Sequence, residues 1–143
     1  MSSIPIVAVT GYFDPFHDIH LDYFKQAIEL RGHLLCIVGS DQQLLMKKGR
    51  FNISEGARQE IVDLILRGLN VDHETVLNTF DTNSTLIAKA LETLHPNVLV
   101  RGGDKCAEDL PDAEREVCNR LHIAVLHTRF RTNRHGSGMT TWV

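Results

Sequence analysis

Two histidines stand three residues apart in the stretch TGYFDPFHDIH, residues 10–20, between an apolar run at 4–9 and a helical apolar pattern at 21–30. The run predicts a buried strand and the pattern predicts a helix, so His17 and His20 lie on one face of its first turn. Backbone N–H groups and the positive end of the helix dipole favour an anion there. The stretch therefore predicts a site that holds a polyphosphate and stabilises its charge during transfer.

The same residues also fit plainer interpretations, which the sequence leaves open. An exposed histidine pair at a capped helix start, or a two-histidine zinc site, would show the same spacing, although no cysteine supports the zinc site. Gly11 predicts a tight turn with close backbone approach to phosphate, and Asp14, before a proline, predicts a turn. Phe13 and Phe16 are predicted to pack inside the protein rather than to stack on a base.

The rest of the chain alternates between short apolar runs and helical patterns. Strands are predicted at residues 33–39, 75–78, 97–100 and 123–127. Helices are predicted at residues 41–46, from Ser54 onward with Ala57, Ile61, Leu64, Ile65 and Gly68 facing inward, at 86–94 and at 112–122. This alternation predicts one Rossmann-like α/β domain over residues 1–143, with a five-stranded parallel sheet and helices on both faces.

In a sheet of this kind, ligands bind beyond the carboxyl ends of the strands, where the strand order reverses. The residues that stand out gather at those ends, at 11–20, 40–41 and 101–104, together with the polar tail at 129–143. Their position predicts one shared site, independently of any resemblance to known proteins.

Charged residues after the second predicted strand lie near the same edge. Asp41 is predicted to cap the short helix at 41–46, and Lys47 and Lys48 follow it in a basic loop. Arg58 falls on the polar side of the next helix. A solvated surface explains these lysines and this arginine nearly as well as a functional role does.

The segment GYFDPFHDIH resembles the G-x-F-D-x-x-H-x-G-H signature of the nucleotidylyltransferase superfamily, in particular its cytidylyltransferase-like enzymes. Ile19 stands where these enzymes have a glycine that lies close to the nucleotide. The matching residues are Gly11, Phe13, Asp14, His17 and His20. The resemblance implies that the two histidines are catalytic and that the nucleotide is bound by these residues together with Thr10 and Tyr12.

Two further segments resemble this family. VLVRGGDK, residues 98–105, is similar to the strand end of glycerol-3-phosphate cytidylyltransferases and of the adenylyltransferase domain of ADP-heptose synthases. The tail RTNRHGSGMTTW loosely resembles an R-T-x-G-I-S-T-T signature, and a frayed terminus is its alternative. The nucleotide-binding residues implied are Arg101, Gly102, Gly103, Asp104, Gly138, Thr140 and Thr141. The resemblance also implies that Lys47 and Arg131 are catalytic. It implies that the acceptor substrate is bound by Asp41, Lys48 and Arg58.

The reaction implied is transfer of CMP or AMP from CTP or ATP to a small phosphorylated alcohol or sugar phosphate, with Mg²⁺ accompanying the nucleotide. Such a reaction needs alignment and positive charge rather than a protein nucleophile. A nucleotide-binding regulatory domain or pseudoenzyme of the same fold is the alternative, which Ile19 and the tail favour. A metal-dependent hydrolase lacks a carboxylate cluster, and an oxidoreductase lacks G-x-G-x-x-G after the first strand.

Composition limits the partners. The formal net charge of −3 gives no electrostatic reason to expect nucleic acid or an anionic membrane. The sequence has neither a run of membrane-span length nor a secretory signal at its start. Cys36, Cys106 and Cys118 lack C-x-x-C spacing and predict free thiols in a reducing cytoplasm. The resemblance implies a homodimer.

Overall fold

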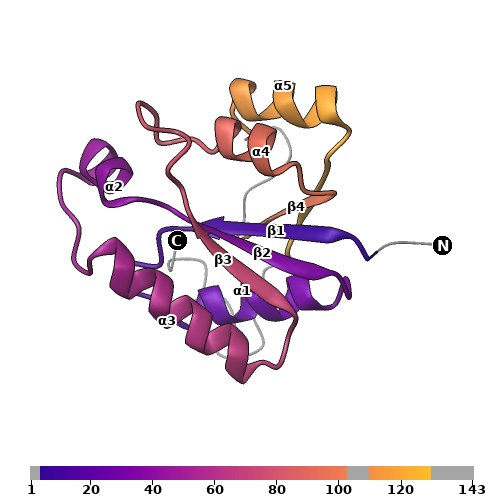
Figure 1. Ribbon diagram of the computed structural model, residues 1–143, viewed down its shortest axis with the longest axis horizontal. Helices are drawn as coiled ribbons and strands as arrows, with labels where there is room; N and C mark the ends of the chain where they lie inside the picture. The colour runs from indigo at the N-terminus through magenta and orange to yellow at the C-terminus, as the bar shows by residue number, and fades with distance from the viewer. Residues whose placement is uncertain (1–3, 103–109, 130–143) are drawn as a thin grey trace.

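Five parallel strands form one sheet in the order β3-β2-β1-β4-β5 in the computed structural model, which describes residues 4–102 and 110–129 (Figure 1). All neighbouring pairs run parallel. The strands are β1 (Ile6–Gly11), β2 (His33–Val38), β3 (His73–Leu77), β4 (Val98–Arg101) and β5 (Ala124–His127). The order reverses between β1 and β4, so the Rossmann-like fold predicted from the sequence is confirmed.

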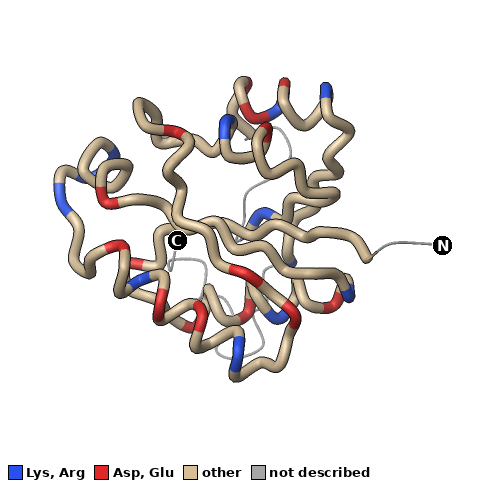
Figure 2. The backbone as a smooth tube through the Cα atoms, viewed as in Figure 1, with Lys and Arg blue, Asp and Glu red and all other residues tan. Residues whose placement is uncertain are grey.

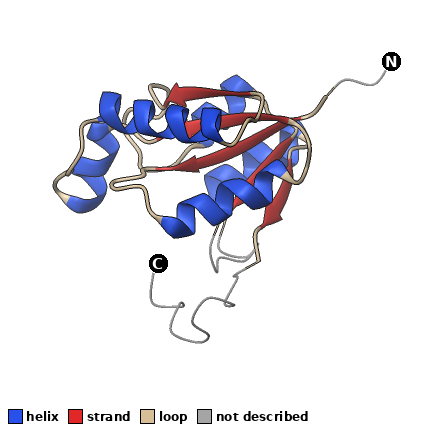
Figure 3. Cartoon of the chain, turned by 90° about the horizontal axis from the view of Figure 1, so that it is seen from below, coloured by secondary structure: helices blue, strands red, loops and turns tan. Residues whose placement is uncertain are grey.

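Helices cover both faces of this sheet (Figures 1 and 3). The helices α1 (Asp18–Ile28) and α3 (Glu55–Gly68) lie on one face, and α4 (Ala88–Leu94) and α5 (Asp112–Leu121) lie on the other. The remaining helix, α2 (Asp41–Lys48), follows β2 beyond the carboxyl edge of the sheet. None of the helices in the described ranges has the length and apolar character that a membrane span requires.

Each face of the sheet has its own apolar core. Because side chains alternate along a strand, Val7 and Val9 of β1 pack toward α1 and α3, while Ala8 between them packs toward α4 and α5. Neither central strand, β1 or β2, carries a Lys, Arg, Asp or Glu residue (Figure 2), as expected for strands that are buried on both sides.

Helix α3 buries a different face from the one that the sequence predicted. Leu64 was expected to point inward but is 57% exposed, whereas Arg58, Val62 and Leu66 are fully buried. Apolar residues extend over a wide arc of this helix, so the pattern alone does not define the centre of its buried face. The prediction failed because a charged residue, Arg58, occupies the first inward position of that face.

The start and end of α2 also differ from the prediction. Ser40, not Asp41, is its N-cap, because the Ser40 hydroxyl accepts from the Gln43 N–H at 3.1 Å. Lys47 and Lys48 form the last turn of α2 rather than a loop, and Gly49 ends the helix in the left-handed conformation at φ 79°. The two lysines are thereby held on a helix next to the carboxyl edge of the sheet.

Candidate functional site

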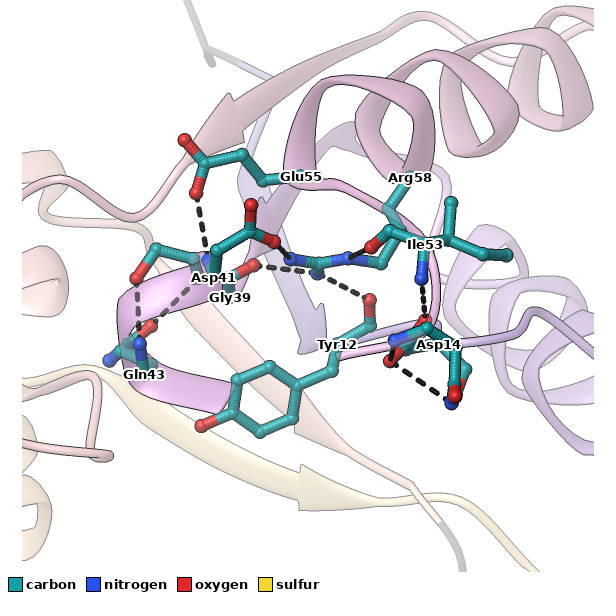
Figure 4. Close-up of polar contacts among 10 residues, drawn as sticks. Tyr12, Asp14, Gly39, Asp41, Gln43, Ile53, Glu55 and Arg58 are labelled. Atoms are coloured by element: carbon teal, nitrogen blue, oxygen red, sulfur yellow. Dashed lines mark hydrogen bonds and ion pairs between the residues drawn. The ribbon is translucent and has the colours of Figure 1, made fainter. Parts of the chain in front are cut away.

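The buried guanidinium of Arg58 joins the chain segments that follow β1 and β2 (Figure 4). It donates to the carbonyl oxygens of Tyr12 at 2.8 Å, Gly39 at 2.7 Å and Ile53 at 2.8 Å. A 2.8 Å ion pair with the Asp41 carboxylate completes its surroundings. The prediction that Arg58 lies on the polar side of its helix is therefore wrong, and these donors bind protein rather than substrate.

Asp14 fastens the loop before α3 to the segment that follows β1. Its carboxylate accepts from the backbone N–H groups of Asn52 at 2.8 Å and Ile53 at 2.7 Å (Figure 4). Asp14 thus holds the start of α3, which carries Arg58, against the end of β1. In this structure its role is to shape the backbone around the site.

The rings of Tyr12 and Phe13 pack against two glycines at the carboxyl ends of β1 and β2. Gly11 is the last strand residue rather than a turn, and the left-handed residue is Phe13 at φ 55°. Phe13 is buried, as predicted, and its ring lies where a Cβ on Gly11 would approach to 3.0 Å. The Tyr12 ring lies so close to Gly39 that a Cβ there would be 2.3 Å away.

Lys47 lies beside the ring of Tyr12. Its ammonium nitrogen is 5.4 Å from the centroid of that ring, a distance suited to a cation–π contact. Lys48 occupies the next position of α2, and both lysines are exposed. The cation–π contact brings Lys47 next to the segment that follows β1.

His17 and His20 are stacked at the amino end of α1, with ring centroids 4.0 Å apart. The Nδ1 atom of His17 accepts from the Ile19 N–H, and the Nδ1 atom of His20 accepts from the His17 N–H, both at 3.2 Å. The helix start is thus partly satisfied by its own histidines. In the neutral form, accepting at Nδ1 leaves the proton on Nε2, so each ring presents an N–H donor on the side away from the helix backbone.

Aromatic packing holds the second of these rings. His20 contacts Phe13 edge-on at 5.0 Å and Phe16 at 5.3 Å between ring centroids. Burial, and to a smaller extent the neighbouring His17, lowers the pKa of His20 to about 4, although Asp18 opposes the shift. His20 is therefore a neutral hydrogen-bond donor at pH 7 in the unliganded protein.

Tyr23 of α1 bridges β1 and β4 at the point where the strand order reverses. The pairing between these strands covers Val7 with Val98 and Ala8 with Leu99. Beyond it, the Tyr23 hydroxyl accepts from the Thr10 N–H at 2.9 Å and donates to the Val100 carbonyl at 2.5 Å. The ring lies against Gly102, where a Cβ would be 3.1 Å from it.

Arg101 ends β4 near a buried carboxylate that the sequence did not single out. Glu114 of α5 accepts from the Ile87 N–H at 3.0 Å, ahead of α4. Burial raises the pKa of Glu114, while the Ile87 N–H and the positive charge of Arg101 oppose this shift. Arg101 thus lies in the field of Glu114, on the α4–α5 side of the sheet.

A pocket of about 350 Å³ lies beyond β2 and β3, next to the Arg58 cluster. Its lining combines the starts of α2 and α3, including Ser40, Asp41 and Glu55, with Asn78 and Asp81 after β3. Carboxylate, amide and hydroxyl groups of this kind hydrogen-bond hydroxyl groups well. The structure thus brings Asp41 to a pocket, with one carboxylate oxygen paired to Arg58.

The structure unites three of the four segments that the sequence placed at one site. The segment after β1, the segment 39–41 and the end of β4 share the carboxyl edge of the sheet. The remaining predicted residues lie outside the described ranges: Gly103, Asp104, Arg131, Gly138, Thr140 and Thr141.

Sequence reasoning missed Tyr23, Gln43 and Glu114. Gln43 had a signal, because Ser40 three residues earlier makes an S-x-x-Q capping box. Its buried amide also donates to the carbonyls of Ser84 and Leu86, both at 2.9 Å. Tyr23 and Glu114 had no such signal in the sequence, because their hydrogen-bond partners are distant in the chain.

These features define a Rossmann-like α/β protein whose polar site lies at the carboxyl edge of its sheet. The chain belongs to the cytidylyltransferase-like family, whose model matches residues 8–141. It is 32% identical over 124 residues to the bifunctional protein HldE of Psychromonas ingrahamii. That match covers 85% of this chain and 24% of HldE, so the chain spans about a quarter of this relative's length.

Solved structures agree on the fold. A lipopolysaccharide core biosynthesis protein of Thermoplasma volcanium superposes with a TM-score of 0.64 at 23% identity, over 90% of this chain and 98% of that one. Thermotoga maritima TmcAL bound with alpha-thio ATP gives 0.54 at 19% identity, over 71% of this chain and 25% of that one. Both structures are less than 25% identical to this chain, so they show the fold alone.

Replacing Arg58 with Met is expected to lower the free energy of unfolding by about 3–5 kcal/mol, because the change leaves the half-buried Asp41 carboxylate and three carbonyls without their donor. Urea denaturation measures the loss. Arg67 of the same helix is the matched control, since it is 70% exposed in its ion pair with Asp63. Arg67→Met should cost less than about 1 kcal/mol. Equal losses in the two variants would contradict the role assigned to Arg58.

The depressed pKa of His20 predicts a pH dependence of stability. Between about pH 4 and the ordinary histidine value of 6.5, the unfolded chain binds a proton at His20 that the folded chain does not. The free energy of unfolding should therefore rise with pH across this window, and His20→Asn should flatten the rise. Urea denaturation of both proteins at a series of pH values measures it.

His33 provides a control of opposite sign. Hydrogen bonds to Asp72 at 2.9 Å and Glu74 at 3.1 Å raise the pKa of His33. Its stabilisation is thus complete below pH 6.5 and is lost as the pH rises through the higher folded value. The gap between wild type and His33→Asn should close above that pH. If the stability difference between wild type and variant changed with pH in the same direction for His20→Asn and His33→Asn, the opposite pKa shifts assigned to the two histidines would be refuted.

Proposed function

We propose that this chain is a nucleotidylyltransferase that moves CMP or AMP from CTP or ATP to a small phosphorylated alcohol or sugar phosphate. A phosphate oxygen of the acceptor forms a bond to the α-phosphorus. The bond from that phosphorus to the bridging oxygen breaks, and pyrophosphate leaves with the electron pair. The observation that carries the proposal is the stacked histidine pair, whose Nδ1 atoms are occupied by the helix start.

His17 and His20 would stabilise the α-phosphate as charge develops on it. Both rings accept hydrogen bonds from the backbone, and contacts with Phe13 and Phe16 also hold the ring of His20, so little reorganisation is needed at the moment of reaction. Hydrogen-bond donors at a helix start favour an anion. The acceptor supplies its own anionic nucleophile, so none is required from the protein.

Lys47 would contact the outer phosphates, because α2 carries it to the Tyr12 ring at the end of β1. Mg²⁺ would enter as part of the substrate, as the complex with CTP or ATP, since it prefers phosphate and water oxygens. The proposal assigns phosphate contacts also to Arg131, Gly138, Thr140 and Thr141. It assigns nucleoside contacts to Arg101, Gly102, Gly103 and Asp104.

The acceptor would occupy the pocket beyond β2 and β3. Asp41 and Glu55 are acidic, so this lining suits the hydroxyl groups of an alcohol or sugar better than its phosphate. The acceptor's phosphate would point out of the pocket toward the α-phosphorus, on the side opposite the outer phosphates, and Lys48 would contact it. A homodimer and a cytoplasmic location stay predictions that rest on resemblance and composition.

The test mixes purified protein with CTP or ATP, Mg²⁺ and a panel of phosphorylated alcohols and sugar phosphates, and measures pyrophosphate release. Wild type should turn over at least one pair, and His17→Ala and His20→Ala should each lower kcat about 10²–10³-fold, the usual effect of losing one donor to the transition state. Lys47→Ala should lower activity much more than Lys48→Ala. Absence of pyrophosphate with every pair, together with absence of nucleotide binding by calorimetry, would refute the proposal.

A nucleotide-binding domain without turnover is the second candidate, and one observation favours it. Ile19 stands in the first turn of α1, where its N–H is occupied by His17. In the proposed function, the phosphates bind at this helix start, where a branched side chain would crowd them. Ile19→Gly should then raise nucleotide affinity or create pyrophosphate release that wild type lacks. If wild type already turns over and Ile19→Gly changes neither quantity, this candidate is excluded.

A further inference from the structure

His127 at the end of β5 is a half-buried residue whose two ring nitrogens are buried and unused in hydrogen bonding. Neither Nδ1 nor Nε2 reaches solvent, and neither has a hydrogen-bond partner among the residues that the structure describes. A buried donor or acceptor left unsatisfied costs about 1–3 kcal/mol. Such groups in native proteins call for an explanation, and a ligand that completes the hydrogen bonds is one.

Among the residues that the structure describes, the other buried or half-buried histidines do not share this property. His73 has only 10% of its side chain exposed, yet its Nδ1 lies 2.8 Å from the Val71 carbonyl and its Nε2 lies 2.8 Å from Asp63. The sequence therefore provides partners for a structural histidine where stability requires them. The unsatisfied ring occurs at the carboxyl edge of the sheet, which is the ligand-binding edge of this fold.

The register of the strands and the alternation of side chains along them place His127 next to Arg101 of the proposed site. His127 pairs with Arg101 across β4 and β5. Val125 and Leu99 belong to the core beneath α4 and α5, so His127 and Arg101, each two residues further along, face the same side. Arg101 is one of the residues that the proposed function assigns to the nucleoside, and His127 is its cross-strand neighbour.

Distance across the sheet decides which part of a nucleotide reaches His127. The histidine pair of α1 follows β1, and β5 lies two strands away, which corresponds to about 10 Å at the usual strand spacing. The proposed function assigns the α-phosphate to His17 and His20 and the nucleoside to Arg101 of β4, so the nucleoside would extend over β4 toward β5.

We propose that His127 hydrogen-bonds the nucleoside part, the ribose or the base, of the nucleotide that this site binds. A neutral imidazole has one donor and one acceptor, which matches a ribose hydroxyl or the mixed edge of a base. The inference rests on the proposed nucleotidyltransferase function and adds a nucleoside-binding residue to it. His127 acts in binding and orientation, whereas the transferred phosphate belongs to the histidine pair.

His127→Phe tests this with effects of opposite sign. Removing two buried and unsatisfied ring nitrogens should leave the melting temperature of the unliganded chain unchanged or raise it. The same change should weaken binding of CTP or ATP about tenfold, the factor expected for one hydrogen bond. Binding of inorganic pyrophosphate, which has no nucleoside, should stay the same. Thermal unfolding and titration calorimetry on the full chain provide the three measurements.

Two variants complete the design. His73→Phe is the matched control, because that ring has partners, so it should lower the melting temperature and leave nucleotide affinity unchanged. His127→Gln keeps a donor and an acceptor and should retain more of the affinity than His127→Phe does. It also tests the proposal if the phenylalanine variant fails to fold.

The outcomes separate this inference from the proposed function. If wild type binds nucleotide and both His127 variants bind it equally well, the inference is refuted and the proposed function stands. If His127→Phe unfolds more easily and loses nucleotide and pyrophosphate binding together, the residue is structural and the inference is again refuted. If wild type binds neither CTP nor ATP, the proposed function fails and this inference fails with it.

Discussion

The fully buried guanidinium of Arg58 is the interaction on which the carboxyl edge of the sheet depends. It ties the segment after β1, the segment after β2 and the loop before α3 to one planar group, and it pairs with Asp41 (Figure 4). A buried charge is tolerated only when it is paired and hydrogen-bonded. The need to satisfy it therefore holds these segments in one arrangement, and Asp14 reinforces that arrangement from the adjacent loop.

The histidine pair that this framework supports adds little positive charge to the site, because the ring of His20 is neutral. His17 and His20 partly satisfy the start of α1 themselves, and the half-buried His20 ring is neutral near pH 7. An anion at this place would meet oriented N–H donors and a helix dipole, with Lys47 approaching from α2. The neighbouring pocket differs from this helix start because acidic groups line it.

The buried and site-lining polar side chains form two groups, which differ in whether the protein itself supplies their hydrogen-bond partners. Arg58, Gln43 and Asp81 are buried and bonded to backbone atoms of other segments, so they maintain the shape of the edge. The ring nitrogens of His127 are buried without such a partner in the described ranges, and Lys47 touches only the face of a ring among them. Groups of the second kind are those available to a ligand.

Apolar periodicity and chain order were enough to predict the alternation of strands and helices and the parallel sheet, because both are local properties of the chain. They also placed residues 11–20 and 40–41 at one edge of the sheet, and His17 and His20 at the start of a helix, as the structure has them. Tertiary packing, in contrast, makes Arg58 internal, brings the Phe13 ring against Gly11, and lets Tyr23 bridge β1 and β4. These facts depend on partners up to 77 residues away in the chain, and no local pattern encodes which distant carbonyl will receive a given donor.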